Sequence, residues 1–125
     1  MKRSWLVVDD GLRVSRDGLD LQLRLPWYRG LPISTVDIGE VRIDGETIDE
    51  SEISISINGK DRPASDLAQY YEEYWYVLDS AYLHVPYAKA KKGYTYEVDV
   101  TVVLYPPYIP GIPFRTNYKE VLHAN

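Results

Sequence analysis

The chain has 125 residues, a length typical of one domain that buries roughly two thirds of its unfolded surface. It has no cysteine, which excludes disulfides, thiolate nucleophiles and zinc–thiolate sites. Its 19 acidic and 14 basic residues give a net charge of −5, which disfavours nucleic-acid binding, and no apolar run is long enough to span a membrane. We therefore expect one domain over residues 1–125, without nucleic-acid or membrane partners.

The N-terminal ten residues carry basic side chains and an apolar stretch that ends after Val8. This stretch is too short for the apolar region of a secretion signal, so we expect a cytoplasmic protein. The aromatic residues are unusual, because 12 tyrosines and three tryptophans accompany a single phenylalanine. A phenol needs a polar partner that a phenyl ring does not, so this excess predicts surfaces that are partly apolar and partly hydrated.

Alternation of apolar and polar residues predicts half-buried β-strands along most of the chain. The predicted strands cover residues 5–8, 19–25, 36–43, 53–57, 77–85, 94–102 and 114–122. Gly39 is a candidate β-bulge, and the strand from residue 94 places Tyr94 and Tyr96 on its apolar face. Five turn dipeptides punctuate the strands: Asp10-Gly11, Asp17-Gly18, Asp44-Gly45, Asn58-Gly59 and Lys92-Gly93. About eight short strands with this spacing predict an all-β fold, an antiparallel β-sandwich of jelly-roll type.

Three segments depart from this pattern. Residues 65–75 predict a short helix with Ser65 as its N-cap, which would place Tyr70 with Tyr74 on one face and Tyr71 with Trp75 on another. Two loops, at residues 26–32 and 105–113, contain six of the eight prolines. Because proline fixes φ, we expect both loops to be stiff.

The polar residues do not form a recognisable active site. The two histidines, His84 and His123, have no partner at metal-ligand spacing, and we expect His84 on a strand surface or edge. Glu72 and Glu73 are neighbours on the predicted helix, so they point in different directions and cannot flank one glycosidic bond. The acidic stretch of residues 44–52 lacks the order of a calcium loop. We therefore predict no catalytic residue and no metal site on this chain.

Aromatic residues next to stiff loops are the stronger signal. Trp27, Tyr28 and Arg29 combine a cation with two rings, and these residue types are enriched in binding hot spots. Trp27 and Trp75 fit loop-on-core packing as well as they fit a contact surface. The candidate contact residues are Trp27, Tyr28, Arg29, Gly30, Tyr74, Trp75, Tyr105 and Tyr108.

One segment also carries a family resemblance. Residues 23–34, LRLPWYRGLPIS, resemble the segment typical of the small (beta) subunit of bacterial C-glycoside deglycosidases. The strand and turn at residues 41–46, the strand near residues 55–59, Trp75 before a strand and the final Tyr/Pro-rich loop fit the same family. The resemblance covers nearly the whole chain, and the twelve-residue segment is its most specific part.

The resemblance implies a β-sandwich subunit in a heterodimer, or a higher oligomer, with a TIM-barrel catalytic alpha subunit. It implies that the pair acts as a lyase in flavonoid C-glycoside catabolism, cleaving the carbon–carbon bond between a 3-keto sugar and an aromatic aglycone. A divalent metal such as Mn and the acid–base residues are then expected in the alpha subunit, with no cofactor on this chain. The eight candidate residues would then contact the partner or the aglycone.

Two other functions fit parts of the sequence. A stand-alone carbohydrate-binding β-sandwich module would stack exposed rings on sugars, but such modules are usually secreted and joined to an enzyme. A complete small enzyme with a jelly-roll metal site would need a histidine pair, which the chain lacks.

Overall fold

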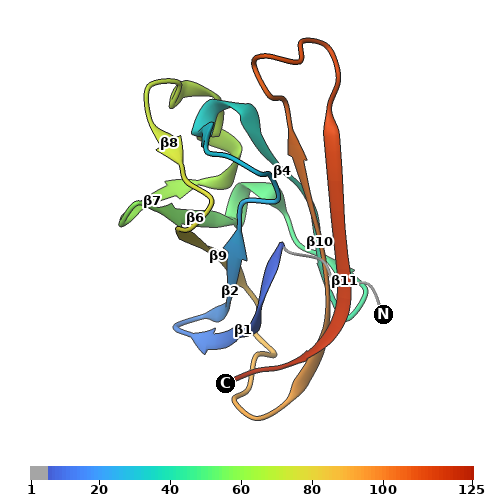
Figure 1. Cartoon of the computed structure of the whole chain (residues 1–125). Helices are drawn as coiled ribbons and strands as arrows, with labels where there is room; N and C mark the ends of the chain where they lie inside the picture. The colour runs from blue at the N-terminus through green and yellow to red at the C-terminus, as the bar shows by residue number, and fades with distance from the viewer. Residues whose placement is uncertain (1–5) are drawn as a thin grey trace.

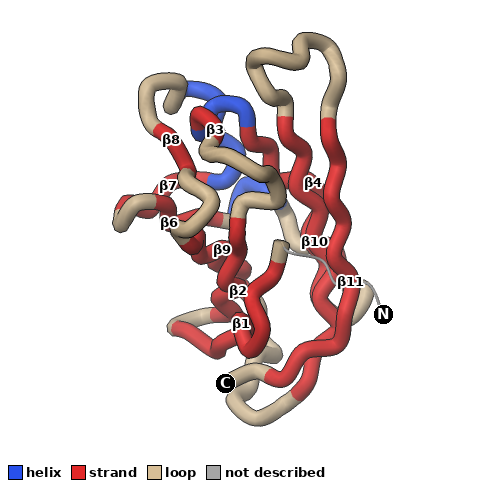
Figure 2. Tube along the Cα trace, in the orientation of Figure 1, coloured by secondary structure: helices blue, strands red, loops and turns tan. Residues whose placement is uncertain are grey.

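Two antiparallel sheets lie face to face in the computed structural model, which describes residues 6–125 (Figures 1 and 2). The first sheet contains, in spatial order, β1 (Val7–Ser15), β2 (Gly18–Arg24), β9 (Ser80–Pro86), β6 (Ser54–Ile57) and β7 (Lys60–Pro63). The second contains β11 (Phe114–His123), β10 (Thr95–Leu104), β4 (Val36–Ile43) and β5 (Glu46–Thr47). A separate pair joins β3 (Leu31–Pro32) to β8 (Tyr74–Trp75). The predicted all-β sandwich is confirmed.

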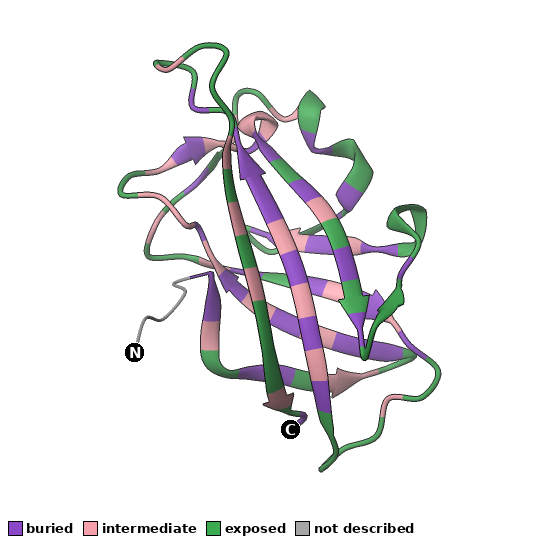
Figure 3. Cartoon of the chain, turned by 90° about the vertical axis from the view of Figure 1, so that its right-hand side faces the viewer, coloured by how far each residue is buried: buried purple, intermediate pink, exposed green. Residues whose placement is uncertain are grey.

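The core lies between the two sheets and follows from the period of two in the sequence. On β2, Leu19, Leu21 and Leu23 are buried, and on β10 the buried set includes Val98 and Val100. Figure 3 shows this alternation as bands along β10 and β4. Each fully buried Leu or Val side chain stabilises the fold by about 1.5–3 kcal/mol relative to an exposed one. Tyr96 belongs to this core, but the prediction for Tyr94 is wrong, because that ring is exposed and precedes the strand.

Two of the predicted turns are tight hairpins. Asp44-Gly45 and Asn58-Gly59 have φ angles of 51° and 81°, and of 55° and 75°, as a type I′ turn requires. Asp10-Gly11 is not a turn. It lies inside β1 where the register to β2 shifts, so this dipeptide provides a bulge instead. Trp5, at the start of the first predicted strand, lies outside the described residues.

The predicted bulge at Gly39 is confirmed by the register of β4 against β10, which shifts between Val100 and Val102. A Cβ at Gly39 would lie 3.2 Å from the carbonyl oxygen of Thr101. The close approach of these two strands therefore favours glycine.

The helical segment is shorter than residues 65–75. It is a 3-10 helix, η3 (Ala64–Gln69), and its N-cap is Pro63, so the prediction of Ser65 as the cap is wrong. Two one-turn 3-10 helices, η1 (Ile33–Thr35) and η2 (Glu50–Glu52), complete the structure of the described residues. No helix among these residues is long and apolar enough to cross a membrane.

Residues 70–75 are extended because the chain pairs with η1 and β3. The carbonyl oxygens of Tyr70 and Glu73 accept hydrogen bonds from the backbone of Ser34 and Ile33. These contacts and the β3–β8 pairing take the place of helical hydrogen bonds, so the predicted helical faces do not form. The segment instead lies at the same end of the sandwich as the 105–113 loop (Figures 1 and 2).

Candidate functional site: an aromatic end

Four predicted contact residues meet at one end of the sandwich, where the β2–β3 loop faces the β10–β11 loop. The indole Nε1–H of Trp27 donates to the Tyr108 hydroxyl at 2.5 Å, and that hydroxyl donates to the Tyr28 hydroxyl at 3.1 Å. The Arg29 guanidinium carbon lies 5.4 Å from the centre of the Tyr108 ring, within cation–π range. The structure thus brings together Trp27, Tyr28, Arg29 and Tyr108, and we call this set the aromatic cluster.

The cluster connects two loops that are 80 residues apart in sequence. Trp27 is half-buried and packs its edge against Phe114, with ring centres 4.9 Å apart. Burial and the hydrogen bond to Tyr28 raise the pKa of Tyr108, so its hydroxyl stays protonated at neutral pH and is available as a donor. Tyr28 is 70% exposed and presents its ring to solvent. A polar network therefore orients an exposed aromatic surface.

The β8 segment extends this surface. The rings of Tyr74 and Tyr76 stack with centres 5.9 Å apart, and both are exposed. A Cβ at Gly30 would lie 2.9 Å from the Tyr76 ring and 3.3 Å from the Trp75 carbonyl oxygen. Gly30 therefore lets the β2–β3 loop lie directly against the tyrosines. We call the aromatic cluster together with Tyr74 and Tyr76 the aromatic end.

Two predicted contact residues lie elsewhere. Trp75 has no exposed surface, and its Nε1–H donates to the Asp79 carbonyl oxygen at 2.9 Å. It is a core residue, so its prediction as a contact residue is wrong. Tyr105 is exposed but borders a separate cavity of about 280 Å³ beside η3, and its backbone N–H donates to Thr35. The structure does not join Tyr105 to the aromatic cluster.

A groove runs along one side of the aromatic cluster and has a volume of about 440 Å³. Its walls come from the end of β2, the β2–β3 loop and the β8–β9 loop. The lining residues are Arg24, Leu25, Trp27, Tyr28, Val77 and Leu78. Sequence reasoning missed Arg24 and Leu78 here. Leu78, which is 79% exposed, carries a signal that could have been used, since it is an apolar residue next to turn residues.

The segment that carries Tyr74 and Tyr76 is fixed by a buried arginine. Arg62 on β7 is 3% exposed, and its Nη1 and Nη2 lie 3.0 and 2.6 Å from the two carboxylate oxygens of Glu73. Its guanidinium lies 4.4 Å from the Tyr70 ring centre, and Asn58 donates to Glu73 and to the Tyr74 carbonyl. The hydrogen bonds from Arg62 and Asn58 lower the pKa of Glu73 to about 2. Sequence patterns contain no signal for this pair.

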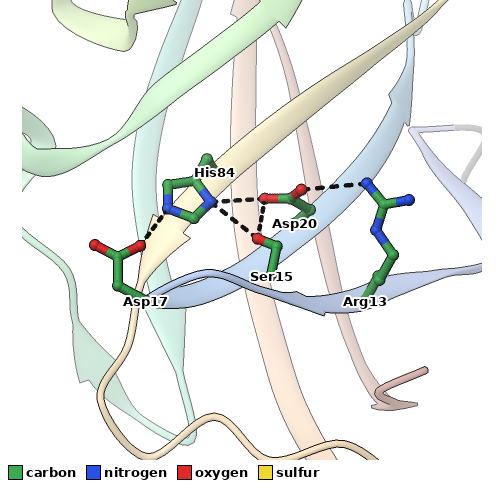
Figure 4. A network of polar contacts seen from close by, with 5 residues as sticks. All are labelled: Arg13, Ser15, Asp17, Asp20 and His84. Atoms are coloured by element: carbon green, nitrogen blue, oxygen red, sulfur yellow. Dashed lines mark hydrogen bonds and ion pairs between the residues drawn. The ribbon is translucent and has the colours of Figure 1, made fainter.

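His84 lies on the outer face of the first sheet, as predicted, and forms a second network (Figure 4). Its Nδ1 is 2.6 Å from Asp20 and its Nε2 is 2.7 Å from Asp17. Ser15 donates to the same oxygen of Asp20 at 2.8 Å, and Arg13 pairs with the other oxygen. The Ser15 hydroxyl oxygen also lies 3.3 Å from Nδ1, the nitrogen that faces Asp20 at 2.6 Å. Because both ring nitrogens face carboxylates and Ser15 donates to Asp20, the arrangement differs from a serine triad, in which one ring nitrogen accepts the serine proton.

The ionisation of this network follows from its contacts. Burial alone would lower the pKa of His84, but hydrogen bonds to Asp20 and Asp17 outweigh it and raise the pKa above its usual value. The hydrogen bond with His84 lowers the pKa of Asp17. The network therefore joins the β1–β2 hairpin to β9 through charge. Within residues 6–125, no group of three or more His, Cys, Asp or Glu side chains could hold a metal ion.

The fold and this surface define a β-sandwich protein with a preorganised aromatic end. A family model described as C-glycoside deglycosidase beta subunit matches residues 7–108, and the chain belongs to this family. The predicted resemblance is confirmed.

Two curated relatives illustrate the similarity. The 3'-dehydrocarminate deglycosidase beta subunit of a Microbacterium species is 32% identical over 110 residues, which cover 88% of this chain and 83% of the relative. A C-glycoside deglycosidase beta subunit of Microbacterium trichothecenolyticum is 33% identical over 104 residues, covering 82% and 79%.

Proposed function

We propose that this chain is the non-metal-bearing subunit of a cytoplasmic C-glycoside deglycosidase and binds a TIM-barrel alpha subunit. The pair cleaves the carbon–carbon bond between a 3-keto sugar and an aromatic, flavonoid-type aglycone, and the complex is a heterodimer or a multiple of it. The aromatic end, with its exposed Tyr28, is the observation that carries this proposal. Family membership supports it, because a beta subunit implies a partner subunit.

The proposed reaction divides its work between two chains. Removing a proton next to a ketone and protonating an aromatic carbon need a general acid–base pair, and a divalent metal such as Mn would polarise the sugar oxygens. We assign those groups to the alpha subunit. This chain contributes binding and orientation, for which rings already fixed by hydrogen bonds lose little conformational entropy.

Arg29, Tyr28 and Tyr108 fit the composition of an interface hot spot. Tyr and Arg are enriched at such sites because they combine large apolar area with hydrogen-bonding groups. Tyr105 is a separate candidate for the edge of the same interface, since it is 49% exposed on a loop that leads into the Tyr108 segment.

Co-purification with a TIM-barrel alpha subunit tests the proposal. Tyr28→Ala and Arg29→Ala should each weaken the complex about 30-fold, because hot-spot truncations cost about 2 kcal/mol. Tyr94→Ala is the matched control: Tyr94 is exposed and its ring lies 5.7 Å from Lys91, but it precedes the first residue of β10, whereas Tyr108 follows the last. Only the assembled pair should cleave a 3-keto C-glycoside.

Three outcomes would contradict the proposal. A chain that never associates with a TIM-barrel partner, or wild-type affinity for both variants, would exclude this function for the aromatic end. Saturable binding of oligosaccharides by the chain alone would favour a carbohydrate-binding module instead.

A further inference from the structure

The groove beside the aromatic cluster contains a cation that forms no ion pair with any residue the structure describes. Arg24 ends β2, and its side chain is half-buried beside Trp27, Tyr28 and Leu78. Its Nε is buried without a hydrogen-bond partner, and no carboxylate in residues 6–125 forms an ion pair with it. Protein atoms enclose the Nε, so a ligand would bind the remaining N–H groups of the guanidinium. A half-buried guanidinium without an ion pair among these residues favours an anionic ligand.

The neighbouring charges do not fill this role. Asp79 follows the groove residue Leu78, yet it is exposed and forms no ion pair with Arg24. Arg29, the other cation near the groove, lies over the Tyr108 ring. Arg24 is therefore the cation that the groove offers to a ligand.

The walls of the groove are apolar and aromatic. Val77 and the exposed Leu78 provide aliphatic surface, while Trp27 and Tyr28 provide two rings whose centres are 5.3 Å apart. The volume of about 440 Å³ lies within the range of small-molecule sites. A guanidinium binds carboxylates with two parallel hydrogen bonds, and aromatic walls bind flat rings.

We propose that this groove binds an aromatic carboxylate, with the acid on Arg24 and the ring against Trp27 and Tyr28. The inference rests on the proposed function in one respect: if the groove ligand is the aglycone of the substrate, that aglycone is an acidic aromatic compound. A sugar alone would leave the guanidinium without a counter-charge, whereas an aromatic acid satisfies both the cation and the rings.

Isothermal titration of the purified full chain tests this with 2-naphthoate and 2-naphthamide, which match in shape and differ in charge. Naphthoate should bind about tenfold or more tightly than naphthamide, which corresponds to one charged hydrogen-bond interaction. Arg24→Met should remove this preference, and Arg24→Lys should retain part of it because a point charge remains without the bidentate geometry. Quenching of Trp27 fluorescence should accompany binding in the wild type.

Arg115→Met is the control, because Arg115 is an exposed cation on β11 that does not line the groove. Equal affinity for the two probes, or unchanged naphthoate binding in Arg24→Met, would overturn the proposal. If Arg24→Met does not fold, the comparison of the two probes on the wild-type chain decides alone.

The two proposals fail separately. A chain that discriminates naphthoate but binds no alpha subunit retains the ligand site and loses the proposed function. The opposite result is also possible to recognise. If the wild-type chain binds both probes equally and Arg24→Met weakens alpha-subunit binding, a partner carboxylate occupies the groove and the aromatic-acid proposal is overturned.

Discussion

Arg62 and Glu73 form an ion pair whose two members differ in burial. The Arg62 side chain is 2% exposed and the Glu73 side chain 26%, with 2.6 Å between Nη2 and Oε2. Solvent can reach the carboxylate but not the guanidinium. The pair connects β7 to the segment that presents Tyr74 and Tyr76, so its integrity bears on the position of the aromatic end.

Replacing Arg62 and replacing Glu73 should lower the free energy of unfolding by different amounts. Arg62→Met replaces a buried charge by an apolar chain and leaves a carboxylate that water can solvate, so we expect a loss of about 1–3 kcal/mol. Glu73→Ala leaves the buried guanidinium without its counter-charge, so its loss should be larger. Urea unfolding of both variants measures the difference. Equal losses, or a larger loss for Arg62→Met, would contradict this account of the pair.

His84 predicts a pH dependence that can be separated from the other groups. Its pKa is raised above 6.5 in the folded chain, so its contribution to stability is complete below pH 6.5 and is lost as pH rises through the folded pKa. Asp17 and Asp20 have pKa values below 3.8, so their contribution is lost when pH falls below that range. Urea unfolding should therefore show the largest stability difference between wild type and His84→Gln between about pH 4 and 6.5.

Above that window the difference should shrink, because the folded imidazolium loses its proton. Arg115→Met, which changes a charge remote from the network, should show no such pH profile. A difference that stays constant from pH 5 to 9 would show that His84 is not charged between its two carboxylates.

Local pattern was enough to predict most of the strands but not their order in the sheets or the segment at residues 70–75. Leu19, Leu21 and Leu23 alternate in sequence and are buried in the structure, because the strand period decides which side chains face the core. Residues 70–75 have helical spacing, yet Ser34 and Ile33 bind their carbonyl oxygens. Such long-range backbone hydrogen bonds have no local signature and outweigh a weak helical preference.

The candidate site shows the same division. Residue types and stiff loops predicted Trp27, Tyr28, Arg29 and Tyr108, which the structure brings into one hydrogen-bonded cluster. Trp75 could not be sorted from them, because a tryptophan in a loop fits a core position equally well. Its burial accompanies the long-range pairing of β8 with β3, in which Trp75 lies opposite Leu31.

Two glycines should tolerate alanine to different degrees. A Cβ at Gly18 would lie 2.0 Å from the Val85 carbonyl oxygen, which is backbone of the paired strand β9 and cannot rotate aside as a side chain can. We expect Gly18→Ala to cost about 1–3 kcal/mol or more. At Gly30 the Cβ meets the exposed Tyr76 ring, which can rotate away, so urea unfolding should show a smaller loss than for Gly18→Ala. A larger loss of stability for Gly30→Ala than for Gly18→Ala would contradict this comparison of a backbone contact with a side-chain contact.

The Tyr108 hydroxyl should control the order of the loop more than the stability of the fold. It accepts from Trp27 and donates to Tyr28, so Tyr108→Phe removes two hydrogen bonds while it retains the ring. Because the cluster is largely exposed and water can replace its hydrogen bonds, global stability should fall only slightly. Amide exchange in residues 106–112 should accelerate, because the loop loses its polar contacts to the β2–β3 loop. Hydrogen-exchange mass spectrometry of the wild type, Tyr108→Phe and a comparison variant, Tyr28→Phe, measures this acceleration.

Tyr28→Phe removes only the acceptor of the second bond and keeps the indole contact, so its effect on exchange should be intermediate. This order follows from the geometry, since Tyr108 is the central member of the chain Trp27–Tyr108–Tyr28. If the aromatic end binds the alpha subunit as a preorganised surface, the affinity of the complex should decline in the same order as loop protection. Faster exchange without any loss of affinity would separate loop order from partner binding and would place the contact outside this cluster.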